Sequence, residues 1–312
     1  MSYSINIASW SLVSTIPLFL ACDSRTWIAA EPAKRTEYEI VDTSRVTPAL
    51  GPQPEIPERV LRFLMWEGEY TGYGEDRPLL FLAHGGGGAP EGYDDLATHV
   101  TNQGYVAVSL AFPLTNENAY DNGITGVTDV PNQPADVSFV LDWLIAAAQD
   151  SEHQLYGRFS TENLAYLGHS LGAQTGLALN RYDCCTDTRF DAWIFVSSMV
   201  LFNDMFFPEN ELPVPSEGPP VVLIHGYDDS VAPIEGSQEI YQTISGSKAF
   251  VGLYDTDHYE VVDNSEPAAT ARMITQDLVV ATLQDWVQGE SGRLAETLQS
   301  IKDAGEDVQW EF

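Results

Sequence analysis

The stretch from Asn163 to Asn180 reads NLAYLGHSLGAQTGLALN. Residues 163–168 are an apolar run that predicts a buried strand, and residues 171–180 predict a helix. Between them lies Gly168-His169-Ser170-Leu171-Gly172, a G-x-S-x-G pentapeptide. A serine on a tight turn between a strand and a helix is typical of a nucleophile elbow. The context, more than the pentapeptide, therefore makes Ser170 the candidate nucleophile.

Both glycines of the pentapeptide are required for steric reasons. The turn is tight and the serine backbone is strained, so a side chain at Gly168 or Gly172 would clash. The N-terminus of the following helix also places amide hydrogens and a partial positive charge near the reacting oxygen.

Strands and helices alternate on both sides of this stretch. Strands are expected at residues 78–83, 105–111, 163–168, 191–196, 220–225 and, as the last one, 248–254, and helices at 92–102, 134–148, 171–180, 268–288 and 292–305. This alternation predicts an α/β fold with a doubly wound, mostly parallel sheet and helices on both faces. No connection is long enough for a large lid. We expect an open, shallow site bordered by the two longest connections, 113–131 and 201–219.

A serine hydroxyl is a weak nucleophile until a base takes its proton. His258 directly follows the expected strand at 248–254 and is the candidate base. The acid should follow the preceding strand, where Asp228 and Asp229 compete. Asp229 is favoured because it lies two residues before an apolar residue and four before a proline. Its role would be to hold His258 in the correct tautomer.

The other histidines suit this role less well. His84 and His225 end strands beside glycine and are expected to orient loops, and His169 is expected to point elsewhere on the turn. His99 lies within a helix, and His153 follows one.

A glycine run, His84-Gly85-Gly86-Gly87-Gly88, follows the strand at 78–83. Glycine lets bare backbone amides approach a developing oxyanion. One donor is expected from Gly86, with Gly87 as the alternative, and the second from Leu171. Each such donor supplies on the order of 3 kcal/mol to transition-state stabilisation. The other reading of this run is a flexible turn.

Together these elements resemble the α/β-hydrolase superfamily over about residues 60–288. Within it, His84-Gly-Gly-Gly-Gly, Gly104-Tyr105-Val106 and the segment 132–142 (NQPADVSFVLD) look like the chlorophyllase, platelet-activating-factor acetylhydrolase and dienelactone-hydrolase-like group. Bacterial cutinases and polyester hydrolases are similar in plan and in the Gly-His-Ser-x-Gly form of the elbow. Dienelactone hydrolases proper use a cysteine nucleophile, so Ser170 departs from them and lactone specificity is not carried over.

The resemblance implies a carboxylic-ester hydrolase that works through a Ser170-His258-Asp229 triad and an acyl-enzyme, without metal or organic cofactor. Small-molecule or polymeric esters are the expected substrates. Phe112, Phe202 and Phe206 are candidates for an aromatic clamp, although a packing role is favoured for them. Amide cleavage or acyl transfer could use the same triad, and a catalytically inactive binding module could use the same fold.

The charge balance is strongly acidic: 46 Asp and Glu residues face 14 Lys and Arg, for a formal charge of −32. Such a surface repels nucleic acid and anionic membranes, so neither is an expected partner. The acids are scattered and form no calcium-loop pattern, which favours adaptation to salty surroundings over cation binding.

The first 22 residues carry no charge and predict a signal segment, because the apolar run Trp10–Ala21 is too short to span a bilayer comfortably. The run ends before Cys22, as in bacterial lipoproteins, although Phe19 and the lack of Lys or Arg depart from that pattern. We therefore expect export from a bacterium (secreted, periplasmic, or membrane-attached through a lipidated Cys22), with a buried or frayed N-terminal segment of a cytoplasmic protein as the alternative.

Residues 23–58 are expected to form a linker that passes into a first strand or two, followed by one domain over 59–312. Adjacent cysteines rarely bridge each other, so Cys184 and Cys185 are expected to be two thiols.

Overall fold

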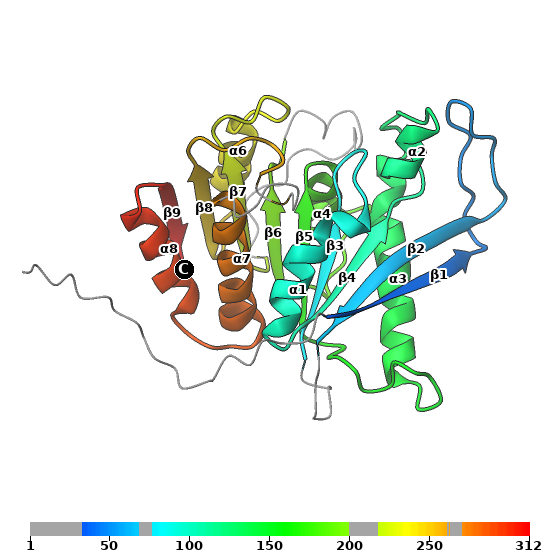
Figure 1. The fold of residues 1–312 in the computed structure, drawn as a ribbon, viewed down its shortest axis with the longest axis horizontal. Coiled ribbons are helices and arrows are strands. Elements are labelled where there is room, and N and C mark those ends of the chain that lie inside the picture. Colours follow the sequence, from blue (N-terminus) through cyan, green and yellow to red (C-terminus); the bar gives the residue numbers. More distant parts are fainter. Residues whose placement is uncertain (1–32, 69–76, 200–217, 261, 263–269) are drawn as a thin grey trace, which may run out of the picture.

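A nine-stranded sheet forms the centre of the protein (Figure 1). The computed structural model describes residues 33–68, 77–199, 218–260, 262 and 270–312. In chain order the strands are β1 Lys34–Asp42, β2 Arg59–Glu67, β3 Leu79–Ala83, β4 Val106–Ala111, β5 Leu164–His169, β6 Ala192–Val196, β7 Val221–Gly226, β8 Lys248–Leu253 and β9 Asp307–Glu311. Their order across the sheet is β1-β2-β4-β3-β5-β6-β7-β8-β9. The six strands β3 to β8 run parallel to one another, whereas β1, β2 and β9 pair antiparallel at the two edges.

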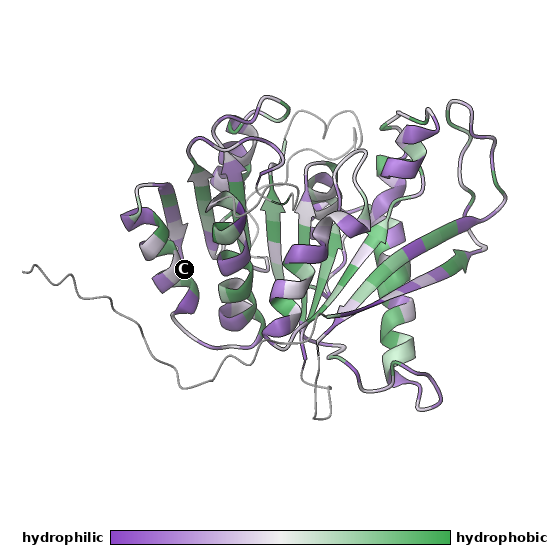
Figure 2. Ribbon diagram, in the orientation of Figure 1, coloured by the Kyte–Doolittle hydropathy of each residue, from purple (hydrophilic) through white to green (hydrophobic). Residues whose placement is uncertain are grey.

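Helices cover both faces of the sheet (Figure 1). One face packs against α1 Asp94–Asn102, α7 Thr270–Thr282 and α8 Arg293–Asp303, and the other against α3 Gln133–Gln149, α4 Leu171–Arg181 and α6 Glu235–Thr243. The strands are apolar on both sides because each side meets helices. In β3, Phe81 joins the core beneath α3 and α4, while Leu80 and Leu82 join the core beneath α1 and α7. Figure 2 shows the central strands largely hydrophobic and the helices divided between hydrophobic and hydrophilic residues.

The predicted fold class is confirmed, with differences at the sheet edges. Strand β1 lies within residues 23–58, where a linker passing into a first strand or two was expected, and it pairs with β2 along its whole length. Strand β9 follows β8, which was wrongly expected to be the last strand. The long C-terminal helix is also divided, since α7 ends at Thr282 and a π-helical turn, η4 Leu283–Val287, continues it.

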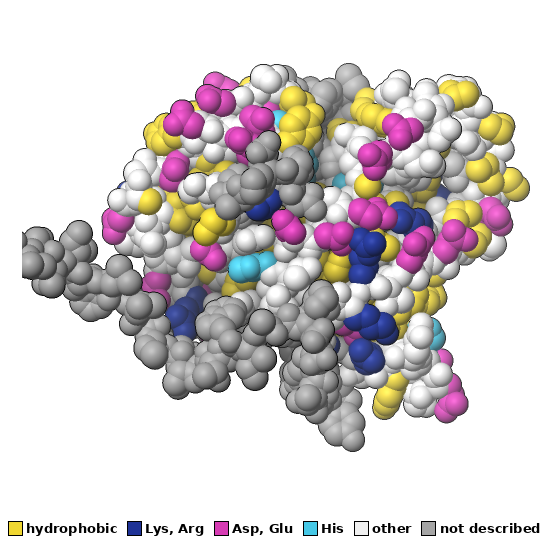
Figure 3. All heavy atoms as spheres, in the orientation of Figure 1, with side chains coloured by type: hydrophobic (Ala, Val, Ile, Leu, Met, Phe, Trp, Pro, Cys, Tyr) yellow, Lys and Arg dark blue, Asp and Glu magenta, His cyan; other side chains and the backbone are white. Residues whose placement is uncertain are grey.

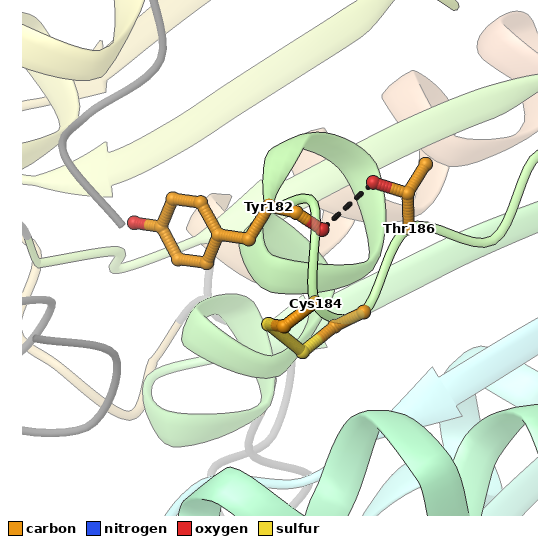
Figure 4. The surroundings of a disulfide bond; sticks show 4 residues. Tyr182, Cys184 and Thr186 are labelled. Atoms are coloured by element: carbon orange, nitrogen blue, oxygen red, sulfur yellow. Dashed lines mark hydrogen bonds between the residues drawn. A yellow bond between two sulfur atoms is a disulfide. The ribbon is translucent and has the colours of Figure 1, made fainter. Parts of the chain in front are cut away.

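The expectation of two free thiols is wrong, because Cys184 and Cys185 form a disulfide bond (Figure 4). The chain turns tightly just after α4, where the Tyr182 carbonyl accepts hydrogen bonds from the amides of Cys185 and Thr186. The Thr186 hydroxyl donates to the same carbonyl. The disulfide therefore joins adjacent cysteines within a tight turn of the chain.

Among the residues that the structure describes, no helix is both long enough and apolar enough to cross a membrane. Residues 1–32, with the expected signal segment and Cys22, lie outside the described part of the chain.

Candidate active site

Ser170 lies between β5, which ends at His169, and α4, which begins at Leu171. Figure 1 shows that α4 follows β5 in the parallel part of the sheet. The Ser170 backbone is left-handed, with φ 53° and ψ −116°, a conformation that few residues other than glycine adopt. A Cβ atom at Gly168 would lie 2.3 Å from the Gly172 carbonyl oxygen. A Cβ atom at Gly172 would lie 2.1 Å from the Ala83 carbonyl oxygen. The turn therefore requires both glycines.

His258 follows β8 and lines the same cleft as Ser170. No hydrogen bond joins the Ser170 hydroxyl to His258 or to any other described residue. Contacts between a nucleophile and its base commonly tighten only when substrate binds. The shared cleft thus places the candidate nucleophile and the candidate base on one surface.

Asp229, rather than Asp228, meets the candidate base. The His258 Nδ1 atom donates to the Asp229 Oδ2 atom over 2.7 Å, and the Asp229 side chain is fully buried. Asp228 is exposed, and only its backbone amide is engaged, donating to the Thr256 carbonyl. The structure therefore assembles the Asp229–His258 pair that the sequence favoured.

The Asp229 carboxylate is held ionised by its neighbours. Burial opposes ionisation, but hydrogen bonds from His225, His258 and the Ala232 amide outweigh it and hold the pKa of this carboxyl well below its usual range. The Oδ1 atom accepts from the amides of Val231 and Ala232 at 2.9 and 2.7 Å. The Oδ2 atom is thereby directed at the His258 ring.

His169 supports the candidate base, although it was expected to point elsewhere. Its Nε2 atom lies 2.9 Å from the His258 carbonyl oxygen, and the centroids of the two rings are 4.7 Å apart. A carbonyl oxygen can only accept, so the His169 Nε2 atom carries the hydrogen. Burial and then the proximity of His258 lower the pKa of His169 to about 3, so this ring is neutral near pH 7. The contact could not be read from the sequence, because His169 ends β5 and His258 lies 89 residues later in the turn that follows β8.

His84 orients a loop, as expected, whereas His225 also contacts the Asp229 carboxylate, with 3.2 Å between His225 Nε2 and Asp229 Oδ2. The His84 Nδ1 atom donates to the Gly85 carbonyl, and its Nε2 atom accepts from the Phe112 amide. Burial lowers the pKa of His84 to about 4, which keeps this bridging ring neutral near pH 7. His225 Nε2 lies 2.8 Å from the Ala232 carbonyl oxygen.

The glycine run forms the cleft wall beside the elbow. The Gly87 amide donates to the Thr115 carbonyl over 2.8 Å, so the alternative oxyanion donor is already engaged in holding the loop. The amides of Gly86 and Leu171 have no hydrogen-bond partner among the described residues. Both residues line the cleft with Ser170 and remain the candidate donors.

The cleft has a volume of about 900 Å³. Its further lining includes Glu91, Glu117, Tyr120, Met199, Val231 and Tyr259, none of which the sequence singled out. Glu117 and Tyr120 do come from the connection 113–131, which was expected to border the site.

Phe112, a candidate for an aromatic clamp for which a packing role was favoured, does not line the cleft. Phe112 is fully buried, and its ring packs edge-on against His84 with centroids 5.1 Å apart. Phe112 directly follows the last residue of β4, and its burial makes it a packing residue. Phe202 and Phe206 lie outside the described residues.

The described part of the chain contains no cluster of three or more His, Cys, Asp or Glu side chains arranged to hold a metal ion. The groups gathered in the cleft are instead a hydroxyl, an imidazole paired with a carboxylate, and backbone amides. They are suited to nucleophilic attack on a polarised carbonyl group.

Comparisons with known proteins support the fold. No protein-family model matches the chain, and no curated protein sequence matches it. Among solved structures, the protein is similar to a ferulic acid esterase from Streptomyces cinnamoneus, with a TM-score of 0.66 and 16% sequence identity. The match covers 90% of this chain and 96% of that chain. At this level of identity the similarity shows the α/β-hydrolase fold and not the activity.

Proposed function

We propose that the protein is a serine hydrolase that cleaves carboxylic esters. The observation that carries the proposal is the strained, left-handed Ser170 in the same cleft as a His258 ring that bonds the buried Asp229 carboxylate. A strained serine at a strand–helix turn is rarely retained for packing alone, because such a backbone conformation costs about 1–3 kcal/mol.

In the proposed reaction, Ser170 Oγ attacks the ester carbonyl carbon while its proton moves to His258 Nε2. The carbonyl electron pair moves to oxygen, and the resulting oxyanion binds the amides of Gly86 and Leu171. The tetrahedral intermediate then collapses, and the leaving alkoxide takes the proton from His258. Water, deprotonated by His258, repeats the sequence on the acyl-enzyme and releases the acid.

The substrates to test first are small esters of aromatic acids. The cleft carries Tyr120 and Tyr259 in its wall, and aromatic side chains offer flat apolar surfaces to a substrate ring. The structural similarity to a ferulic acid esterase suggests methyl ferulate as one probe. A solid polyester is the second probe, since the sequence also resembles cutinase-type enzymes.

The test measures hydrolysis of p-nitrophenyl acetate, p-nitrophenyl butyrate and methyl ferulate by wild type and Ser170→Ala, together with fluorophosphonate labelling. We expect ester hydrolysis and labelling in wild type, and a loss of both in Ser170→Ala. Ser197→Ala is the matched control, because Ser197 shares the left-handed backbone (φ 51°) but is fully buried. Absence of both hydrolysis and labelling in wild type would refute the proposal.

Matched amides of the same acids test the competing chemistry. Ester hydrolysis without amide hydrolysis is the expected result. Faster cleavage of the amide than of its ester would reassign the site to amidase activity.

A further inference from the structure

The short helix α2, Glu117–Asp121, is fixed directly against the glycine run. The Gly87 amide donates to the Thr115 carbonyl, and the Glu117 amide donates to the Gly88 carbonyl, both over 2.8 Å. The Asn116 side chain begins the helix by accepting from the Ala119 amide. The position of α2 relative to the candidate oxyanion loop is therefore set by backbone hydrogen bonds.

Tyr120, on this helix, lies across the glycine run. A Cβ atom built at Gly87 would lie 2.8 Å from the Tyr120 ring. A Cβ atom built at Gly86 would lie 2.9 Å from the Tyr120 hydroxyl oxygen and 2.9 Å from Leu171 Cδ1. The hydroxyl thus lies beside Gly86, on the side that the Leu171 side chain also approaches, next to the two residues whose backbone amides are the candidate oxyanion donors.

The Tyr120 hydroxyl has no hydrogen-bond partner among the described residues, whereas the nearby Tyr93 hydroxyl donates to the Ala83 carbonyl. Tyr120 is half-buried and lines the cleft. Burial raises the pKa of its hydroxyl, so the group stays protonated and can donate near pH 7. A hydroxyl that lines the cleft and has no described protein partner is suited to donate to an acceptor on a bound ligand.

We propose that Tyr120 is a further catalytic residue, whose hydroxyl donates a hydrogen bond to the substrate carbonyl oxygen as negative charge develops on it. The hydroxyl would be a third donor beside the amides of Gly86 and Leu171. No proton is transferred, and the bond strengthens as the carbonyl becomes an oxyanion. This inference rests on the proposed ester hydrolysis and adds a side chain to its oxyanion site.

The test compares wild type, Tyr120→Phe and a control, Tyr156→Phe, whose side chain is exposed (52%) and does not line the cleft. Tyr120→Phe removes a single oxygen atom and keeps the ring, so the fold should persist, which circular dichroism checks. For p-nitrophenyl butyrate we expect kcat to fall by about 100-fold with KM nearly unchanged, since the lost interaction acts mainly in the transition state.

A second measurement separates oxyanion binding from a structural role. An aryl trifluoromethyl ketone adds to a serine to give a hemiketal with an anionic oxygen, and its Ki should rise in Tyr120→Phe by the same factor as kcat/KM falls. A change confined to KM, or an unchanged Ki, would overturn the role of Tyr120 while leaving the esterase proposal intact. An inactive, unlabelled wild type would instead refute the esterase proposal.

Discussion

At the scale of single residues, the surroundings of the Asp229 carboxylate require a buried group that accepts hydrogen bonds through both oxygen atoms. The carboxylate is fully buried and bonds the His258 ring through one oxygen and two backbone amides through the other. An uncharged replacement keeps the shape but reverses the hydrogen bond to His258 Nδ1, which leaves the imidazole in the wrong tautomer to act as a base.

We expect Asp229→Asn to lower kcat for ester hydrolysis by about 10⁴-fold. Asp228→Asn is the control, because the Asp228 side chain is exposed. The activity of this variant should stay close to that of wild type. Steady-state kinetics on p-nitrophenyl butyrate checks both variants. Equal losses in the two variants would contradict the assignment of the acid.

The depressed pKa of Asp229 also predicts how stability depends on pH. The unfolded-state pKa of an aspartate is about 3.9, and the folded-state value lies below it. The stabilising contribution is therefore present above about pH 4 and is lost as the pH falls towards the folded-state pKa. Urea unfolding should show a wild-type advantage over Asp229→Asn near neutral pH that shrinks in acid. An advantage that grows in acid would reverse the sign of the inferred shift.

At the scale of elements, one buried side chain links three parts of the site. Gln133, at the start of α3, accepts from the Thr175 hydroxyl of α4 and donates to the Thr115 hydroxyl, at 2.5 and 2.7 Å. The Thr115 carbonyl in turn holds the Gly87 amide. Gln133 thus joins the nucleophile helix to the glycine run through contacts that are fully shielded from water.

We expect Gln133→Leu to reduce the free energy of unfolding by about 1–3 kcal/mol, because it leaves a buried threonine hydroxyl without its donor. The kcat for ester hydrolysis should fall too, since the loop that carries Gly86 loses its link to α4. Urea unfolding and steady-state kinetics give the two readouts. Gln149→Leu, an exposed position at the other end of α3, is the matched control. Indistinguishable effects at the two positions would argue against the link.

Whether an element could be predicted depended on its place in the sheet. Inner strands such as β3 and β7 are buried on both faces, so their continuous apolar runs were visible in the sequence. The outer strands β1 (KRTEYEIVD) and β9 (DVQWE) are mostly polar and gave no such signal. Their hydrogen-bonding partners, and not their own composition, make them strands.

Residues of the candidate site could likewise be predicted only where the local sequence marks them. Ser170, Asp229 and His258 each follow a strand in a recognisable local pattern, and the sequence named all three. Tyr120 and His169 acquire their positions through contacts with distant segments, so no local pattern could identify them. Gly87 satisfied the local pattern for an oxyanion donor, but a carbonyl from the 113–131 connection occupies its amide.

At the scale of the whole molecule, the main feature is the large excess of negative charge. Figure 3 shows acidic side chains spread over the visible face, with fewer basic ones among them, in keeping with the formal charge of −32. Repulsion among these carboxylates opposes the compact state, and dissolved salt screens it, since the Debye length falls from about 30 Å at 0.01 M to about 3 Å at 1 M.

We therefore expect the melting temperature to rise between low-salt buffer and 1 M NaCl, as measured by differential scanning calorimetry. A parallel titration with sucrose, which is uncharged, separates screening from general exclusion effects. A melting temperature that stays flat across the salt range would remove the proposed adaptation to salty surroundings.

Strand β1 has a practical consequence for anyone who shortens this protein. Trimming the chain to the region that starts at residue 59 would remove Lys34–Asp42 and uncover the hydrogen-bonding edge of β2. Most residues of β2 are buried, so the uncovered edge would present an apolar strand with unpaired amides and carbonyls. Such edges recruit strands from other molecules. By pairing with β2, the polar strand KRTEYEIVD covers this edge and is expected to limit self-association.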